Sequence, residues 1–286
     1  MSEPNAGNGR EDDSMDTEVG FNQEYAKLRL QHAYLKEECA NLIEMYSNLV
    51  TVVGPNLETD YRVKVGLREH RVMELTLELR RWQRRMTLRQ EALNRGEKPD
   101  YVAIERRLDE EFAAFRRKVR EREAELEKAV ERYNRGHVGE KRMTEIRTAY
   151  LAAVKRLHPD LNPDLPEAAR GLWMRIQEAY AERDWTALDF LVGLVDGAAG
   201  GGAKFAGTAD GLEEMRQAVG RLRKVCDDLR AKTAELKGNE PYSLREFLEN
   251  PEEVKVRQDA LDEQAAALEA RIAEYRQAWK EETDGE

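Results

Sequence analysis

The sequence contains little of what β-sheets and compact loops require. Of its 286 residues only 8 are proline and 7% are aromatic, and runs of β-branched residues are few. Charged residues make up 36% and the hydrophobic set 41%. This mixture is typical of long solvated helices and unfavourable for a β-sandwich or a parallel sheet. The composition therefore predicts an all-α protein.

Long hydrophobic runs and an excess of positive charge are also missing. No stretch of 18 apolar residues exists, so we expect no membrane span. The acidic, polar N-terminus does not have the pattern of a secretory signal, and we expect a cytoplasmic protein. The 47 basic and 57 acidic residues give a net charge of −10. That charge argues against general nucleic-acid binding, which needs positive charge to meet the phosphates.

Metal ligands and catalytic motifs are equally scarce. The chain has four histidines and two cysteines, Cys39 and Cys226, which are far apart in the sequence. They cannot form a CxxC metal knuckle, and we expect two reduced thiols, as suits a reducing compartment. The motifs GxxxxGKS/T, HExxH, GxSxG and GxGxxG are all absent. We therefore expect no enzyme activity, no cofactor and no metal site.

Apolar residues recur at alternating steps of three and four in three successive seams. The seams are separated by Gly54-Pro55-Asn56 and by residues 95–99, and proline and glycine end helices. Because short turns force neighbouring helices to run antiparallel, residues 21–134 are predicted to form a three-helix antiparallel coiled coil. The acidic residues 1–20 cannot bury apolar area, so we expect a disordered tail there.

The same pattern returns near the C-terminus. Two seams separated by a break at residues 238–241 predict a helical hairpin over residues 211–282. The glycine-rich residues 196–210 before it are expected to form a linker. The seams leave open whether helices pair within one chain or between copies, so a homo-oligomer held by coiled coils is an alternative.

Residues 140–195 differ in kind from the long seams. Two apolar stripes of helical spacing flank a proline-rich loop, so two helices should close on each other as an antiparallel hairpin. Pro159 ends the first helix and pushes His158 out of the helical region. We therefore expect His158 and Asp160 to project at an exposed tip. A rigid turn without another role is the alternative interpretation of this tripeptide.

Residues 144–180 resemble the J-domain family of DnaJ-like co-chaperones. The matching features are Ala149-Tyr150 in the first helix, the tripeptide His158-Pro159-Asp160, and Ile176 followed by Ala179-Tyr180 in the second helix. In that family the loop docks on a DnaK-type heat-shock ATPase and stimulates its ATP hydrolysis. The resemblance implies that Asp160 engages an arginine of this partner while His158 and Pro159 fix the loop.

The resemblance also implies that the helix before the loop offers basic residues to an acidic patch of the partner. The basic residues expected to do so are Arg147, Lys155 and Arg156. Complementary charge of this kind mainly accelerates and orients docking. The long helices would then bind client proteins or place the J-domain-like module.

Some positions depart from the family pattern. Leu151 and Ala152 stand where two bases are frequent, Leu161 stands where a base often follows the tripeptide, and the short first helix of the family is missing. The chain is therefore either a J-domain-like co-chaperone or a coiled-coil scaffold whose module no longer couples to a chaperone.

Two helices of this length bury too little apolar surface to stand alone. We expect two further elements to pack on the hairpin, namely the end of the third coiled-coil helix and the helix that carries Trp185. Residues 120–195 would then form one cooperative unit.

Residues 62–95 hold ten basic residues and only four acids, together with Trp82. Such a helix could bind RNA or an acidic protein. The alternative is internal pairing with the acid-rich residues 105–111, which come next along the chain. We favour internal pairing because these acids lie so close in sequence.

Overall fold

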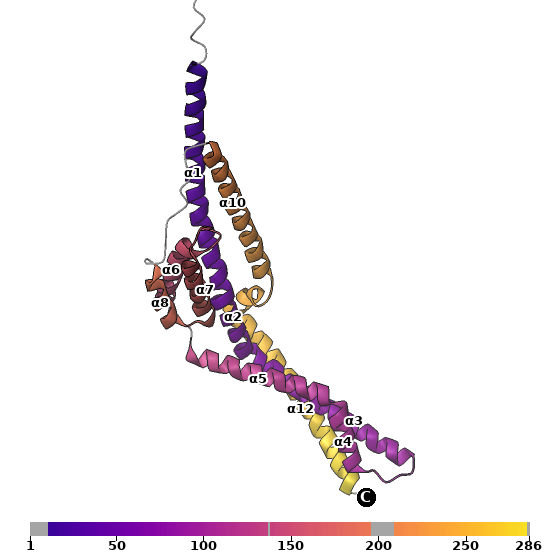
Figure 1. The fold of residues 1–286 in the computed structure, drawn as a ribbon. Coiled ribbons are helices and arrows are strands. Elements are labelled where there is room, and N and C mark those ends of the chain that lie inside the picture. The colour runs from indigo at the N-terminus through magenta and orange to yellow at the C-terminus, as the bar shows by residue number, and fades with distance from the viewer. Residues whose placement is uncertain (1–10, 137, 196–208, 285–286) are drawn as a thin grey trace, which may run out of the picture. The chain divides into compact units, whose positions relative to one another are not determined.

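The computed structural model describes residues 11–136, 138–195 and 209–284. Within these ranges every regular element is a helix, so the predicted all-α fold is confirmed (Figure 1). The chain divides into two compact units. Unit 1 contains the residues up to Gly54 and those from Val138 to Asn239, and unit 2 contains Pro55 to His137 and the residues from Glu240 onward.

Unit 1 combines the N-terminal helix with the segment that follows residue 138. Its elements are α1 (Glu11–Asn48), the π-helix η1 (Leu49–Val53), α6 (Glu140–Leu157), α7 (Glu167–Glu182), α8 (Trp185–Gly193) and α10 (Ala209–Gly238). Since α1 begins at Glu11, the second half of the expected disordered tail is helical. Residues 1–10 and most of the expected linker, 196–208, lie outside the described residues.

Helices α1 and α10 run parallel and in a constant register. The contacts are Glu24 with Arg216, Gln31 with Arg223 and Glu38 with Arg230, and each joins residues 192 positions apart. Each contact lies one heptad beyond the one before it on both helices, which is the repeat that the seams predicted. The predicted partner of α10 was wrong. A hairpin over residues 211–282 requires α10 to pack on the last helix, but α10 packs on α1.

The helix break predicted at Gly54-Pro55-Asn56 is absent. The backbone stays helical through η1 and α2 (Gly54–Tyr61), and Gly54 has φ −57° and ψ −55°. Pro55 has no N–H, so the turn before it lacks one backbone donor. Arg183 supplies side-chain donors to this turn, because its Nε and Nη2 donate to the Thr51 oxygen at 2.9 and 2.5 Å. A π-helical turn and a distant side chain thus keep the helix continuous.

Unit 2 is a second group of packed helices. Its elements are α2, the π-helix η2 (Arg62–Gly66), α3 (Leu67–Asn94), α4 (Tyr101–Glu111), α5 (Ala113–Arg135), the 3₁₀ helix η3 (Tyr242–Leu244), α11 (Arg245–Glu249) and α12 (Pro251–Asp284). Helix α3 packs on α4, α5 and α12. The predicted three-helix coiled coil of residues 21–134 is therefore not formed, because its first helix, α1, belongs to unit 1.

The α3–α12 pair is also parallel. Arg68 bonds to Asp262 at 3.0 Å and Arg71 bonds to Glu269 at 2.7 Å, so the contacts advance together along both helices. Leu75, Leu79 and Ile272 are buried between the two helices. The apolar seam of α12 thus has its partner within the same chain.

One large apolar cluster forms the core of unit 1. Most of its buried residues lie between Ile146 and Val195, and α1 adds Cys39, Ala40 and Ile43. The helix with Trp185 packs on this cluster as predicted, but α5 belongs to unit 2. The prediction that residues 120–195 form one unit is therefore wrong, and α1 supplies the missing third surface.

Candidate partner-binding site

Helices α6 and α7 pack through their apolar stripes. Ile146, Tyr150 and Leu157 are buried on α6, and Trp173 and Tyr180 are buried on α7. The ring of Tyr150 stacks on Tyr180 with centroids 4.0 Å apart and lies 5.8 Å from the ring of Trp173. This aromatic contact fixes the two helices relative to each other and so positions the loop between them.

His158 ends α6 and turns the chain into the loop. Its φ of −69° and ψ of 128° are extended, as the following proline requires. Its ring packs edge-on against Trp173 at 5.2 Å, and its side chain is only 16% exposed. Burial lowers the pKa of His158, and the nearby carboxylate of Asp160 opposes this shift. The ring is therefore neutral at pH 7.

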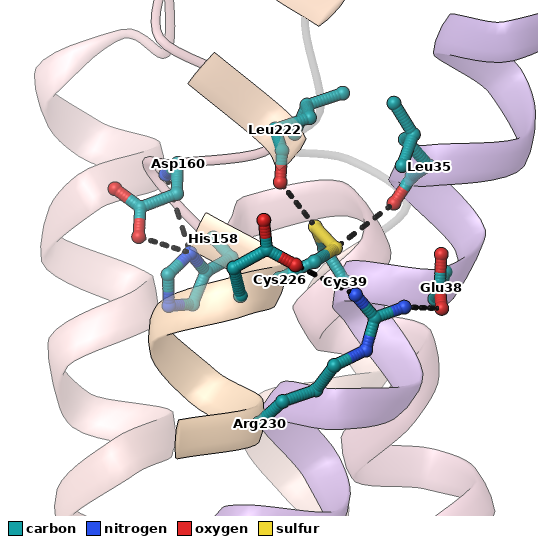
Figure 2. Close-up of a disulfide and its surroundings, with 9 residues drawn as sticks. Leu35, Glu38, Cys39, His158, Asp160, Leu222, Cys226 and Arg230 are labelled. Carbon is teal, nitrogen blue, oxygen red and sulfur yellow. Dashed lines mark hydrogen bonds and ion pairs between the residues drawn. A yellow bond between two sulfur atoms is a disulfide. The ribbon is translucent and has the colours of Figure 1, made fainter. Parts of the chain in front are cut away.

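Asp160 has the opposite environment. Its side chain is 54% exposed, and its backbone N–H donates to Nδ1 of His158 at 3.2 Å. This hydrogen bond assigns the ring proton of the neutral His158 to Nε2. Figure 2 shows the Asp160 carboxylate beside the His158 ring. The prediction of an exposed tip is thus correct for Asp160 and wrong for His158, because Trp173 gives that ring an apolar surface to cover.

The rest of the loop is tied down by Asn162 and by apolar anchors. The Asn162 side chain donates to the carbonyls of Lys155 and His158 at 3.1 and 3.3 Å, and it accepts from Lys36 Nζ of α1 at 2.7 Å. Leu161 is 4% exposed in the core. Burial therefore accounts for the leucine at this position.

The basic residues of α6 do not share one exposed surface. Arg147 donates from Nε and Nη2 to the carboxylate of Glu44 on α1 at 2.6 and 2.9 Å, and these hydrogen bonds raise the pKa of Arg147. Lys155 pairs with Glu37 of α1. Arg147 and Arg156 are exposed and Lys155 is partly buried, but Arg147 and Lys155 are held by acids of α1. Two of the three therefore face α1.

Sequence reasoning missed the α1 residues of this region. Glu37 and Glu44 lie seven positions apart, so they share one face of α1. That spacing was visible in the sequence, but nothing local indicated which basic helix the acids would meet. These acids meet α6 because α1, and not α5, completes the core.

The two cysteines were predicted to be reduced thiols, and this prediction is wrong. Cys39 of α1 and Cys226 of α10 form a disulfide with Cα atoms 5.2 Å apart, and both residues are fully buried. The Cys39 sulfur lies 3.2 Å from the carbonyl oxygen of Leu222. Arg230 pairs with Glu38 beside the bond (Figure 2). The parallel α1–α10 pair is thus covalently closed.

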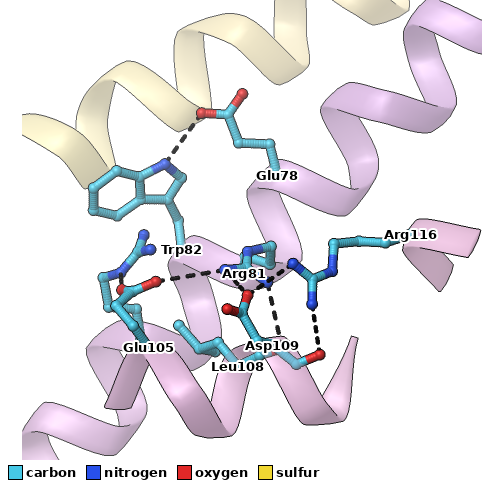
Figure 3. A network of polar contacts seen from close by, with 8 residues as sticks. Glu78, Arg81, Trp82, Glu105, Leu108, Asp109 and Arg116 are labelled. Atoms are coloured by element: carbon cyan, nitrogen blue, oxygen red, sulfur yellow. Dashed lines mark hydrogen bonds and ion pairs between the residues drawn. The ribbon is translucent and has the colours of Figure 1, made fainter. Parts of the chain in front are cut away.

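The arginine-rich stretch of unit 2 is paired internally, but among the described residues only Arg81, Arg84 and Arg85 pair with the predicted residues 105–111, and α12 supplies acids to several others. Each of the ten basic residues between 62 and 95 contacts a carboxylate, a carbonyl or an aromatic ring of unit 2. Figure 3 shows Arg81 reaching Glu105 and Asp109 of the acid-rich stretch, while Arg116 also contacts Asp109. These contacts favour internal pairing over RNA binding as the role of the basic residues.

No protein-family model matches this chain, and no curated protein or solved structure does. Among the described residues, no group of three or more histidine, cysteine, aspartate or glutamate side chains could hold a metal ion. None of the described helices is both long enough and apolar enough to cross a membrane.

Proposed function

We propose that this protein is a J-domain-like co-chaperone that docks on a DnaK-type heat-shock ATPase through the loop His158–Asp160. In this role it is not itself an enzyme, and its long paired helices present client proteins or place the module in an assembly. The observation that carries the proposal is the exposed carboxylate of Asp160 on a loop in which His158, Leu161 and Asn162 are held in place.

The geometry of the loop favours recognition of a cation by Asp160. The His158 ring orients the backbone of Asp160, and Asn162 holds the start of the loop. An exposed carboxylate can accept two parallel hydrogen bonds from an arginine, which is the strongest neutral-pH pairing available to it. Because the loop is already ordered, docking loses little conformational entropy there.

A second candidate function is a helical scaffold whose module no longer couples to a chaperone. The observation that favours it is the pairing of Arg147 and Lys155 with α1, which leaves fewer basic charges for an acidic partner. In that case the tripeptide acts only as a helix stop. The two candidates differ in one measurable property, the stimulation of ATP hydrolysis by the partner.

The test is single-turnover ATP hydrolysis by the DnaK-type chaperone with and without this protein. We expect stimulation that Asp160→Asn abolishes without a change in the melting temperature, because an exposed carboxylate contributes little to stability. Asp164→Asn is the matched control, since Asp164 is an exposed acid of the same loop. Equal stimulation by the Asp160→Asn variant and the control would reject the docking role of the tripeptide and favour the scaffold.

The proposal also places the protein in the cytoplasm, beside a DnaK-type partner. In that compartment disulfides are usually kept reduced, but the bond between Cys39 and Cys226 is fully buried. Reagents reach a buried bond only after local opening. Alkylation of free thiols in freshly lysed cells would give the fraction of the chain with the bond closed.

A further inference from the structure

The face of α6 that would meet an acidic partner already meets an acidic helix. Arg147 and Lys155, two turns apart on α6, pair with Glu44 and Glu37 of α1. The order of the pairs shows that α1 runs antiparallel to α6. Both bases are therefore occupied by acids of a single neighbouring helix.

The two ion pairs differ in strength. The Glu44 side chain is only 7% exposed and accepts two hydrogen bonds from Arg147, so solvent screens this pair little. Lys155 and Glu37 are 37% and 56% exposed, so solvent screens their attraction. One pair thus anchors α1, and the other can exchange with a competing carboxylate.

Helix α1 also contributes apolar side chains to the core that it shares with the module. Its buried residues there are Cys39, Ala40 and Ile43, and Leu35 and Leu42 pack against this core partly buried. The module has its own aromatic core around Tyr150 and Trp173. Release of α1 exposes apolar surface, so the closed arrangement is favoured until a partner competes for α6.

The disulfide makes the covering element more than a single helix. Cys39 lies between Glu37 and Glu44 on α1, and its bond to Cys226 joins α1 to α10. Because both cysteines belong to the buried cluster, the two helices contact the module as one body. Movement of α1 away from α6 therefore moves α10 with it.

We propose that α1 is a built-in competitor that covers the docking face of α6. Glu37 and Glu44 occupy the bases that an acidic surface of the partner ATPase would bind, so the described arrangement is the closed form. Full docking follows only when the α1–α10 pair moves off this face. This inference rests on the proposed function and adds its regulation.

The test compares two double substitutions on α1 that change the charge equally. Glu37→Gln with Glu44→Gln removes the acids that face α6, whereas Glu24→Gln with Glu38→Gln removes acids that face α10. Hydrogen exchange over residues 140–157 reports access to α6, and stimulated ATP hydrolysis reports docking.

In the first variant we expect faster exchange over α6. The concentration needed for half-maximal stimulation should fall about tenfold, because loss of the cover raises the binding-competent fraction. The control pair should change neither quantity. Glu37→Gln alone neutralises a side chain that is more than half exposed, so this variant should keep the fold. It should lower the concentration for half-maximal stimulation about twofold.

The outcomes separate this inference from the proposed function. Stimulation that depends on Asp160 but is equal in the two double variants would overturn the competition and leave the co-chaperone role intact. Unchanged exchange over residues 140–157 would also overturn it. Absence of stimulation by every variant, despite faster exchange in the first, would instead reject docking on the DnaK-type ATPase.

Discussion

Reduction of the bond between Cys39 and Cys226 should strongly destabilise unit 1. The two cysteines are 187 positions apart, and closing a loop of that size lowers the entropy of the unfolded chain by an amount equivalent to about 5 kcal/mol. This free energy depends only logarithmically on loop length, so the folded part of unit 2 within the loop changes it little. With an m-value of about 2 kcal/mol per molar urea, the unfolding midpoint should fall by roughly 2.5 M.

The assay needs a probe that sees unit 1 alone. Trp82 and Trp279 pack against each other in unit 2, so replacing both with phenylalanine leaves Trp173 and Trp185 as fluorophores of unit 1. The protein is reduced in denaturant, because the bond is fully buried in the folded state, and it is then refolded with or without reductant.

The matched control is Cys39→Ala with Cys226→Ala. This variant should unfold near the reduced wild type and should not respond to reductant. Equal midpoints for the oxidised and reduced proteins would refute the reasoning, since the covalent closure of α1 on α10 would then contribute nothing. A reductant-dependent shift in the alanine variant would point to an effect unrelated to the bond.

Two further predictions concern one contact in each unit. Arg183→Ala should destabilise unit 1 by about 2 kcal/mol in urea unfolding, because the carbonyl of Thr51 loses a charged donor. Arg183 has a φ of 59°, so Arg183→Gly should lose about 1 kcal/mol less, and equal losses would contradict this account. In unit 2, hydrogen bonds from Arg84 lower the pKa of Glu111 to about 2. The Arg84–Glu111 pair therefore stabilises unit 2 fully above pH 4.5, and this stabilisation is lost as the pH falls towards 2. The melting temperature of Glu111→Gln should depend less on pH in that window than the melting temperature of the wild type. An unchanged dependence would count against the pair.

The sequence was sufficient to predict which faces of the helices are apolar. The heptad residues Leu222 and Cys226 are buried, as are Leu75 and Leu79 in the second seam. A heptad pattern states that a helix has a partner but does not identify it. Parallel pairing across 192 positions depends on all the intervening structure, so short turns suggested antiparallel neighbours instead.

The candidate site was predictable where local chemistry decides it. Pro159 ends α6, and Asp160 is exposed, as the tripeptide suggested. The helix through Pro55 was not predictable, because Arg183 donates to the carbonyl of Thr51 from a position 132 residues further along the chain. The burial of His158 likewise depends on Trp173, which the loop sequence does not reveal.

The parallel register of α1 and α10 determines when each contact becomes available during synthesis. Arg147, which pairs with Glu44, follows it by 103 positions, whereas each α1–α10 contact joins residues that are 192 positions apart. At 5 to 20 residues per second, α1 leaves the ribosome roughly 10 to 40 seconds before its parallel partner. Helix α6 is therefore the first to reach α1, and Cys226 arrives only after that contact can form. The nascent chain thus meets its own acidic helix before its disulfide closes.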